Sequence, residues 1–336
     1  MDIRGKNIFI TSCGGLGDLI VCTPALKRLK EKYDCHITFL CQKKYESAIK
    51  GLSYIDKVVS IERGKFLGRY KCIFSGKLWK QDCIVFTDWH PILLLAAHLF
   101  RVPVIAGVPR EGHRFTKYLT KKICNHVFAD TCYAAVSNAK TYSEALDVEL
   151  SGDMIDIDVS DPSDGDCKKV HDLLASVGCE EKKYILLAPF AALNLRDWPI
   201  DTAREFVCKA EAKYGIPVVV VGSATNKNEA AQISNYTLTG ETTILQLVHL
   251  IKQARVVVAM DSGPMHVAGA VGTPLVALFS RDLPSKWAPK KKCKVIYMNY
   301  QCSPCSIEMV KACSKKVSCI KDIGADMVLK KLDELI

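Results

Sequence analysis

Two glycine-containing segments of the sequence have residue types that could hold an anion. The first spans residues 13–18 and contains Gly14, Gly15 and Gly17, between an apolar run of strand length and an amphipathic run. Glycines at such a place let backbone N–H groups approach a negative charge at the start of a helix. Asp18 follows at the expected N-cap, where its carboxylate could cap the helix or accept a proton as a general base. The glycine spacing fits neither the dinucleotide-binding fingerprint nor a phosphate-binding loop, which needs Lys followed by Ser or Thr.

The second segment, residues 260–268, again ends an expected strand and opens an expected helix. Its candidate binding residues are Asp261, Ser262, Gly263 and His266. Backbone N–H groups at the positive end of this helix suit a diphosphate, and His266, one turn further on, could donate a hydrogen bond to the ligand. The same residue types also serve as helix caps or core residues, so the segment alone does not decide between these roles.

A third loop, residues 188–199, follows the first expected strand of the second half of the chain. Arg196 is placed to reach a phosphate group from the carboxyl end of that strand. Trp198 stands directly before Pro199, and we expect it to pack at the start of the next helix. The loop therefore offers one cation to an anionic ligand and one aromatic residue to the core.

Four cysteines near the C-terminus have the spacing C-x2-C-x7-C-x5-C, namely Cys302, Cys305, Cys313 and Cys319. Such spacing suits tetrahedral ligation of a metal ion by thiolates. The alternatives are unpaired thiols, or two disulfides if the protein were exported. Because the cluster lies far downstream of the three loops, we expect it to have a structural role.

The elements that position these residues alternate between strand-length apolar runs and amphipathic helical stretches. Alternation of this kind predicts parallel strands joined by crossover helices, which is an α/β fold. Strands are expected at 7–12, 36–41, 57–61, 83–87, 103–106, 184–188, 217–221, 255–260 and 274–279, and helices at 18–33, 43–50, 201–214 and 242–254.

The chain is long enough for two domains. Its 336 residues include an acidic stretch, 147–166, with eight acidic residues and no basic one, and a turn-rich connector at 160–165. The sequence therefore predicts two Rossmann-like lobes, 1–160 and 161–336, facing each other across a cleft. Ligands of such folds bind at the carboxyl ends of the strands, so the cleft is the expected site.

Composition excludes several classes of protein. With 49% hydrophobic residues the chain is not intrinsically disordered, and its net charge of +10 favours anionic partners. Sixteen cysteines scattered through apolar runs favour a reducing compartment, and the N-terminus lacks the apolar region of a signal peptide. The longest apolar stretch, 91–109, is interrupted by His98, Arg101 and Pro103, so we interpret it as a buried helix and a strand rather than a membrane span.

Together, the three loops resemble the bacterial heptosyltransferase family, glycosyltransferase family nine, which has the two-lobed GT-B fold. The specific parts are Gly17-Asp18 followed by residues 23–26 (TPAL), the loop 196–199 (RDWP), and residues 261–266 (DSGPMH) leading to 272–279 (GTPLVALF). The resemblance implies transfer of a sugar, typically heptose from ADP-heptose, to a lipopolysaccharide-core or protein hydroxyl with inversion. No catalytic divalent metal is expected, because Arg196 and the helix N-termini can stabilise the leaving diphosphate.

The resemblance also implies roles for individual residues. Asp18 would be the general base, on the acceptor-side loop that contains Gly14, Gly15 and Gly17. Arg196, where relatives usually have Lys, would contact the diphosphate. The remaining donor-binding residues would be Asp261, Ser262, Gly263 and His266. Relatives often have an acid for the nucleotide ribose soon after the strand at 217–221, whereas here the first acid is Glu229.

The resemblance extends to the four cysteines and to the partners. Similar cysteine segments occur in relatives that glycosylate autotransporter proteins, where bound iron is implied, and zinc is equally compatible with thiolate ligands. Two basic stretches, 101–122 and 286–294, are either solvated faces or, for the first, a contact with phosphorylated lipopolysaccharide or the anionic inner membrane. The protein is therefore expected in the cytoplasm, either free or peripheral at the inner membrane.

Two other functions remain open at this point. A GT-B sugar-nucleotide epimerase would need further carboxylates in the cleft, and a non-catalytic nucleic-acid-binding protein could combine a zinc module with the positive charge. Because no nucleic-acid-binding motif is present, we do not expect a nucleic-acid partner.

Overall fold

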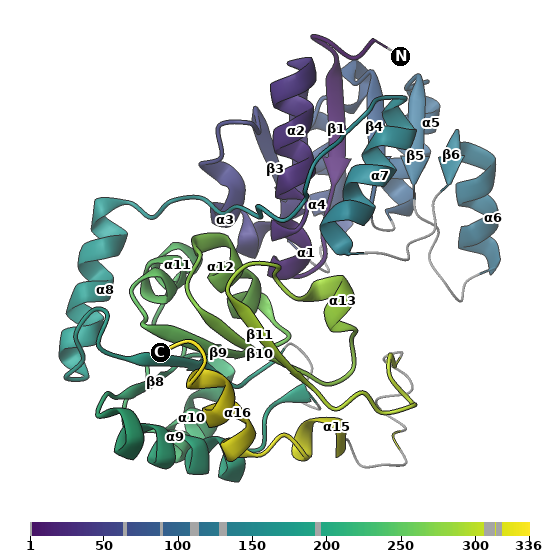
Figure 1. Cartoon of the computed structure of the whole chain (residues 1–336). Coiled ribbons are helices and arrows are strands. Elements are labelled where there is room, and N and C mark those ends of the chain that lie inside the picture. The colour runs from purple at the N-terminus through teal and green to yellow at the C-terminus, as the bar shows by residue number, and fades with distance from the viewer. Residues whose placement is uncertain are drawn as a thin grey trace. The chain divides into compact units, whose positions relative to one another are not determined.

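The structure is a computed structural model that describes residues 2–62, 66–87, 90–107, 114–127, 133–191, 196–305, 313 and 318–336. The chain divides into two compact units, Met1–Ser160 and Asp161–Ile336, and the division falls in the acidic connector. Each unit contains one parallel β-sheet with helices on it (Figure 1). This architecture confirms the expected α/β class with two Rossmann-like units.

The first unit has a six-stranded parallel sheet in the order β3-β2-β1-β4-β5-β6. The strands are β1 (Asn7–Thr11), β2 (His36–Gln42), β3 (Lys57–Ile61), β4 (Cys83–Phe86), β5 (Val104–Gly107) and β6 (His126–Val127). The strand order reverses between β1 and β4, so the loop that follows β1 lies at the topological switch point of the sheet.

The helices of the first unit differ from the expected ones in three places, one of which is 43–50, where a 3₁₀ turn and a four-residue helix replace the single expected helix. They are α1 (Leu16–Ile20), α2 (Thr23–Tyr33), α3 (Ser47–Lys50), α4 (Phe66–Ser75), α5 (Pro91–Leu99), α6 (Arg114–Ile123) and α7 (Ala134–Leu146), with short 3₁₀ turns η1 (Lys43–Tyr45) and η2 (Leu78–Lys80). The single helix expected at 18–33 is broken after Ile20, because Pro24 has no N–H to continue the helical ladder and starts α2 instead. The helix α5, expected to be buried, exposes Leu95 and Leu99 on one face.

The second unit has a five-stranded parallel sheet in the order β11-β10-β9-β7-β8. Its strands are β7 (Ile185–Ala188), β8 (Val218–Val220), β9 (Val256–Met260), β10 (Leu275–Phe279) and β11 (Cys293–Tyr297). Its helices are α8 (Asp164–Ser176), α9 (Ile200–Tyr214), α10 (Lys227–Ile233), α11 (Ile244–Lys252), α12 (Gly263–Val271), α13 (Pro284–Trp287), α15 (Ser318–Lys321) and α16 (Ala325–Leu332), and η4 spans Ala224–Asn226. The adjacent parallel strands β7, β9 and β10 bring the loops that follow them to one edge of the sheet.

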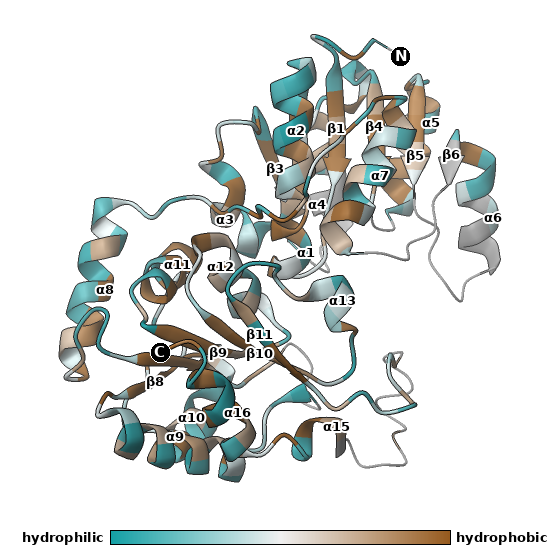
Figure 2. Cartoon of the chain, in the orientation of Figure 1, coloured by the Kyte–Doolittle hydropathy of each residue, from teal (hydrophilic) through white to brown (hydrophobic). Residues whose placement is uncertain are grey.

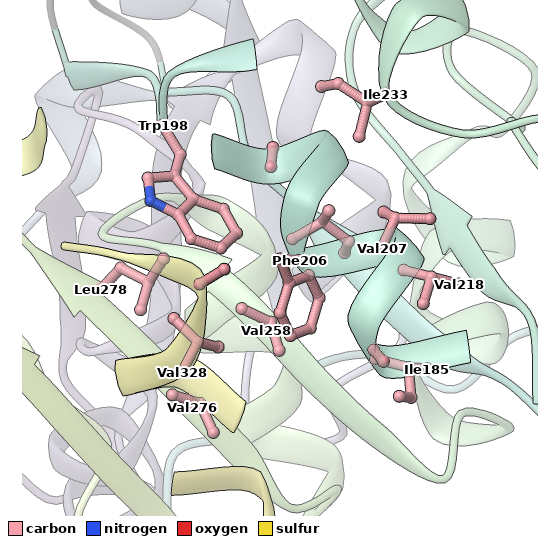
Figure 3. Packing of buried hydrophobic residues seen from close by; sticks show 14 of the residues in the cluster. Ile185, Trp198, Phe206, Val207, Val218, Ile233, Val258, Val276, Leu278 and Val328 are labelled. Carbon is pink, nitrogen blue, oxygen red and sulfur yellow. The ribbon is translucent and has the colours of Figure 1, made fainter. Parts of the chain in front are cut away.

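Trp198 packs in the core of the second unit, as its place before Pro199 led us to expect. The indole is 1% exposed, packs against Phe206 with ring centroids 5.5 Å apart, and donates a hydrogen bond from Nε1 to the carbonyl of Ile323 at 2.8 Å. Figure 3 shows Trp198 and Phe206 among aliphatic side chains of the sheet and of α16. The loop that carries Arg196 is therefore anchored in the core two residues further on.

The fifteen cysteines that the structure describes are free thiols. Burial raises the pKa of the Cys41 and Cys83 thiols to about 12, so these residues pack as small hydrophobes. Among the described helices, none is long and apolar enough to cross a membrane.

Candidate functional site

Four charged side chains form a cluster at the carboxyl edge of the second sheet. Asp261 directly follows β9, Arg281 and Asp282 follow β10, and Arg196 lies in the loop after β7. Arg196 Nη1 lies 3.7 Å from Asp261 Oδ2 and 3.3 Å from Asp282 Oδ2. Arg281 makes a bidentate pair with Asp282, with both N–O distances 2.9 Å. The cluster thus contains two guanidinium groups held by two carboxyl groups.

The electrostatics of this cluster favour an anion. Burial and, second, the negative charge of Asp282 raise the pKa of Asp261, Arg196 opposes both effects, and the resulting pKa is about 7. Asp261 therefore carries a proton in a large fraction of molecules near neutral pH. Protonation of Asp261 removes one negative charge from beside the two arginines, so the cluster then favours an anionic ligand.

The N-terminus of α12 lies directly after Asp261. Ser262 is the N-cap in extended conformation, and its hydroxyl donates to the Met260 carbonyl at 3.1 Å instead of capping the helix. Gly263 is the first helical residue and has no side chain, Pro264 has no N–H, and the Met265 N–H donates to the Ser262 carbonyl at 3.1 Å. The candidate donors to a ligand in this turn are therefore the N–H groups of Ser262 and Gly263, where the sequence led us to expect a diphosphate.

His266 lies one turn into α12 and is buried. Burial lowers the pKa of its imidazole to about 4, so the ring is neutral at physiological pH. The edge of the ring lies against Trp287, with centroids 6.2 Å apart. Within the described part of the chain, no group makes a hydrogen bond with Nδ1.

Two further buried polar atoms near these loops lack partners among the described residues, namely Arg196 Nε and Glu229 Oε2. Glu229 lies in the first turn of α10, and its negative charge adds to the burial that raises the pKa of Asp197 to about 6. Asp197 Oδ1 accepts the N–H of Ala191 at 2.6 Å, and residues 192–195 lie outside the described residues. Because buried polar groups are normally hydrogen-bonded, these atoms together with His266 Nδ1 indicate a place for a polar ligand.

Asp18 lies in the first unit, after β1. We had expected Asp18 to be the N-cap, and this expectation is wrong. The helix α1 begins earlier, so Gly15 is the N-cap and Asp18 is the third helical residue. Asp18 Oδ2 accepts the N–H of Gly15 at 2.6 Å. A side chain at Gly14 would put its Cβ 2.5 Å from Asp18 Oδ2, so this carboxylate requires glycine there.

Hydrogen bonds from a residue of β2 hold the acceptor-side loop in place. Gln42, the last residue of β2, donates from Nε2 to the carbonyls of Cys13 and Gly14, at 2.5 and 2.6 Å. Gly17 is buried within α1. The loop thus holds the Asp18 carboxylate at a defined place at the switch point of the first sheet.

The structure brings together Arg196, Asp261, Ser262, Gly263 and His266 in the second unit, while Asp18, Gly14, Gly15 and Gly17 form a separate group in the first. Sequence reasoning missed Arg281 and Asp282. A signal was present, because Ser280, Arg281 and Asp282 are the first polar residues after the strand expected at 274–279. Polar residues directly after a parallel strand lie at the edge where α/β folds bind ligands.

Two residues of the four-cysteine segment contact the loop that carries Arg281, although the sequence separation suggested otherwise. The backbone N–H of Cys305 donates to the Arg281 carbonyl at 3.3 Å, and the Ser303 hydroxyl donates to the Ser280 carbonyl at 3.3 Å. The segment therefore supports the loop that carries Arg281 and Asp282.

The four thiols are within electrostatic range of one another. Burial raises the pKa of Cys319, and the charges of Cys305, Cys313 and Cys302 raise it further. The thiol of Cys305 donates to the Cys302 carbonyl at 2.8 Å. Among the described residues, which leave out 306–312 and 314–317, no group of three or more His, Cys, Asp or Glu side chains is arranged to hold a metal ion.

A comparison with protein families matches residues 94–316, more than half of the chain, to a model described as glycosyltransferase family 9 (heptosyltransferase). The chain is 28% identical over 116 residues to the lipopolysaccharide core heptosyltransferase OpsX of Haemophilus influenzae. This match covers 32% of the chain and spans only about one third, 33%, of that relative.

Solved structures share the fold over the whole chain. A family 9 glycosyltransferase from Veillonella parvula has a TM-score of 0.84 at 17% identity, with 100% of this chain and 98% of that chain covered. TibC of enterotoxigenic E. coli, described as an iron-containing dodecameric heptosyltransferase in complex with ADP-D-β-D-heptose, has a TM-score of 0.61 at 13% identity. That alignment covers 100% of this chain and 77% of TibC.

Proposed function

Because the chain belongs to glycosyltransferase family 9, the heptosyltransferases, we propose that it transfers a heptose from an ADP-heptose-like donor to a hydroxyl of a lipopolysaccharide core or protein acceptor, with inversion. The observation that carries the proposal is the partly buried cluster of Arg196, Asp261, Arg281 and Asp282 beside the N-terminus of α12. A nucleotide diphosphate is the ligand class that uses both features, because it needs charge-assisted contacts and backbone donors together.

On this proposal the second unit binds the donor. Arg196 and Arg281 hold the diphosphate and stabilise its charge as the bond to the sugar breaks. Asp282 pairs with both guanidinium groups, so it orients them. The Glu229 oxygen that lacks a partner among the described residues is the candidate for the nucleotide ribose, in the role that an earlier acid has in relatives.

The first unit binds the acceptor on this proposal. Asp18 accepts the proton of the acceptor hydroxyl as that oxygen attacks the anomeric carbon, and the bond from that carbon to the diphosphate breaks on the opposite face. Its hydrogen bond from Gly15 holds the carboxylate at the start of α1. General-base assistance of this kind contributes about 10² to 10⁴ in rate.

The donor half of the proposal is tested by calorimetric binding of ADP, UDP, GDP and CDP. We expect ADP to bind tightest. Arg196→Ala should weaken its binding about 10- to 100-fold, because a charge-assisted contact is worth about 1.5 to 3 kcal/mol. Arg204→Ala, which removes an exposed arginine on α9, is the matched control and should leave ADP affinity unchanged. Equal ADP affinity in the two variants would remove Arg196 from the donor site.

We further propose that Cys302, Cys305, Cys313 and Cys319 hold a structural iron or zinc ion. Support comes from their spacing, from their mutual electrostatic range, and from the iron described in TibC. The donor set of four thiolates suits either ion. A metal there would fix the segment that supports Arg281.

Elemental analysis of protein purified without chelator tests the metal site. We expect about one equivalent of iron or zinc, lost in Cys305→Ser, because three thiolates do not close a tetrahedral site. Cys208→Ser, at an exposed cysteine on α9, is the control and should retain the metal. Metal-free wild-type protein with free thiols confirmed by titration would reduce the cluster to four ordinary cysteines.

The proposed location is the cytoplasm, with peripheral contact at the inner membrane where a lipid-linked acceptor is presented.

A further inference from the structure

Exposed large hydrophobic side chains in the described part of the first unit gather on four elements. They are Phe74 on α4, Trp79 on η2, Leu95 and Leu99 on α5, Phe100 directly after α5, and Tyr118 on α6. The exposed fraction reaches 66% for Phe74 and 70% for Leu99, which is unusual for such residues. We refer to these six side chains as the aromatic surface.

Three rings of the aromatic surface contact one another, and its other side chains lie on helices that pack together. The ring of Trp79 lies edge-on to both Phe74 and Phe100, with centroids 5.9 Å apart in each pair. Leu95 and Leu99 are four residues apart and therefore lie on one face of α5. The helix α5 packs against α4, η2 and α6, and Figure 2 shows it coloured as hydrophobic along much of its length. Contiguous exposed apolar surface of this kind marks an interaction site.

The charge on these elements has a single sign. Residues 66–80, 91–107 and 114–123 together contain nine Lys and Arg and no Asp or Glu. The described cationic side chains among them are all exposed, namely Lys71, Lys77, Lys80, Arg101, Lys121 and Lys122. The ammonium group of Lys122 lies 5.8 Å from the ring centroid of Tyr118, at the aromatic surface itself. A partner for this surface must therefore be both apolar and negatively charged.

We propose that the aromatic surface and its lysines dock onto an anionic phospholipid bilayer. Trp and Tyr favour the boundary between headgroups and acyl chains, and Lys side chains can lay their apolar stems there while their ammonium groups reach anionic headgroups. A second copy of the chain fits less well, because a symmetric contact would bring the cationic elements of both copies together. This inference adds a membrane-docking surface to the proposed function. It rests on the proposed function only where it assumes that the acceptor is linked to a lipid.

Flotation with vesicles tests the docking without any sugar nucleotide. Wild-type protein should bind phosphatidylcholine vesicles that contain about 30% phosphatidylglycerol, release on addition of salt, and not bind pure phosphatidylcholine. The double variant Phe74→Ser with Leu99→Ser should lower the partition coefficient about tenfold or more, since two apolar side chains no longer enter the boundary. The double variant Lys77→Glu with Lys80→Glu should also lower the partition coefficient, because two positive charges that attract anionic headgroups are replaced by negative ones.

Matched controls come from the second unit. Met327→Ser removes an exposed apolar side chain, and Lys168→Glu with Lys169→Glu makes the same change of charge on α8. We expect both control variants to bind anionic vesicles as the wild type does. If they lose binding as strongly as the first-unit variants, the attraction is a property of total charge and the proposal is wrong.

Trp79 provides a readout that does not depend on disruptive variants. Its fluorescence should shift to shorter wavelength on anionic vesicles and be quenched by brominated acyl chains, and Trp79→Phe should lose both signals. Vesicle binding without these signals would overturn the proposal. So would a dimer that the Phe74 and Leu99 substitutions abolish, in a protein that does not bind vesicles.

The test separates this proposal from the proposed function. The first-unit surface variants should transfer sugar to a soluble acceptor fragment at the wild-type rate. Vesicle binding with no transfer to any acceptor would leave the docking surface intact and contradict the transferase. Transfer of sugar by a wild-type protein that does not bind vesicles would support the transferase and contradict the docking surface.

Discussion

At the scale of single residues, the site depends on polar groups that the fold leaves partly unsatisfied. Arg196 pairs with two carboxyl groups, yet its Nε and the Nδ1 of His266 have no partner in the part of the chain that the structure describes. A bound diphosphate sugar would supply acceptors and donors for these atoms. The raised pKa of Asp261 acts in the same direction, because protonation of this carboxyl leaves the two arginines of the cluster paired with Asp282 alone among its carboxyl groups.

The first prediction concerns Asp18. Asp18→Asn should lower turnover by at least ~10² and leave donor affinity nearly unchanged, because the base serves the acceptor and not the diphosphate. The asparagine oxygen can still accept the Gly15 N–H, so the fold should survive. Steady-state kinetics and ADP calorimetry measure the two effects, with the exposed Asp34→Asn as control. Turnover close to wild type would leave Asp18 with only its role at the start of α1.

The second prediction concerns the pH dependence of donor binding. Asp261 has a pKa of about 7, so raising the pH from 6 to 8 ionises it and adds a negative charge beside the diphosphate. ADP affinity should therefore fall more steeply over this range in the wild type than in Asp261→Asn, in which that charge cannot form. Calorimetry of both proteins at several pH values measures the difference, and parallel profiles would show that Asp261 does not titrate there.

The same shift has a consequence for stability. The pKa of Asp261 is raised on folding, so the native state holds the proton more tightly than the unfolded chain. This contribution to the free energy of unfolding is fully present below pH 4 and is lost as the pH rises through about 7. Relative to wild type, Asp261→Asn should gain stability at pH 8 and not at pH 4, which urea titrations at the two pH values measure.

At the scale of elements, most strands could be predicted from the sequence because buried parallel strands appear as short, nearly continuous apolar runs. The strand β11 could not, because its residues 293–297 include Lys294 and follow a lysine-rich stretch, and the edge of the sheet tolerates such exposure. The interruption between α1 and α2 was missed because the amphipathic pattern continues through it, and only Pro24 marked the break.

The candidate site was predictable in part for the same reason. Asp261 and Arg196 stand in loops after apolar runs. Arg281 and Asp282 also follow an apolar run, but the pairing of Asp282 with Arg196 depends on β10 lying beside β9, which no local pattern predicts. The contact of Cys305 with the Arg281 loop joins two segments that no local pattern connects.

The third prediction tests how the Arg196 loop is anchored. Trp198→Ala should lower the free energy of unfolding by about 3 to 5 kcal/mol, because a large buried side chain is lost from the core. Trp198→Phe should cost less, about 1 to 3 kcal/mol, since it mainly leaves the Ile323 carbonyl without its donor. Urea unfolding followed by circular dichroism measures both. The exposed Trp79→Ala is the control and should change stability by less than about 0.5 kcal/mol; a Trp198→Ala effect this small would contradict the packing.

At the scale of the whole molecule, the chain has two α/β units with different chemical character. The first has the Asp18 loop at its switch point and the aromatic, cationic surface on α4, η2, α5 and α6. The second has the arginine-rich site at the carboxyl edge of its sheet. On the proposed function, this division of properties suits a transferase with a water-soluble donor and an acceptor presented at a membrane.

The most direct test of the central claim is a transfer reaction followed by mass spectrometry and NMR. Purified protein is mixed with ADP-heptose and one acceptor in each reaction. The acceptors, tested in parallel, are truncated lipopolysaccharide core and candidate proteins. We predict stoichiometric formation of ADP and an acceptor heavier by one heptose, with the anomeric configuration opposite to that of the donor. Asp18→Asn should be at least ~10² slower in the same assay. If the anomeric configuration were retained, or if ADP-heptose and other nucleotide sugars were left intact with every acceptor, the assignment of an inverting heptosyltransferase would be wrong.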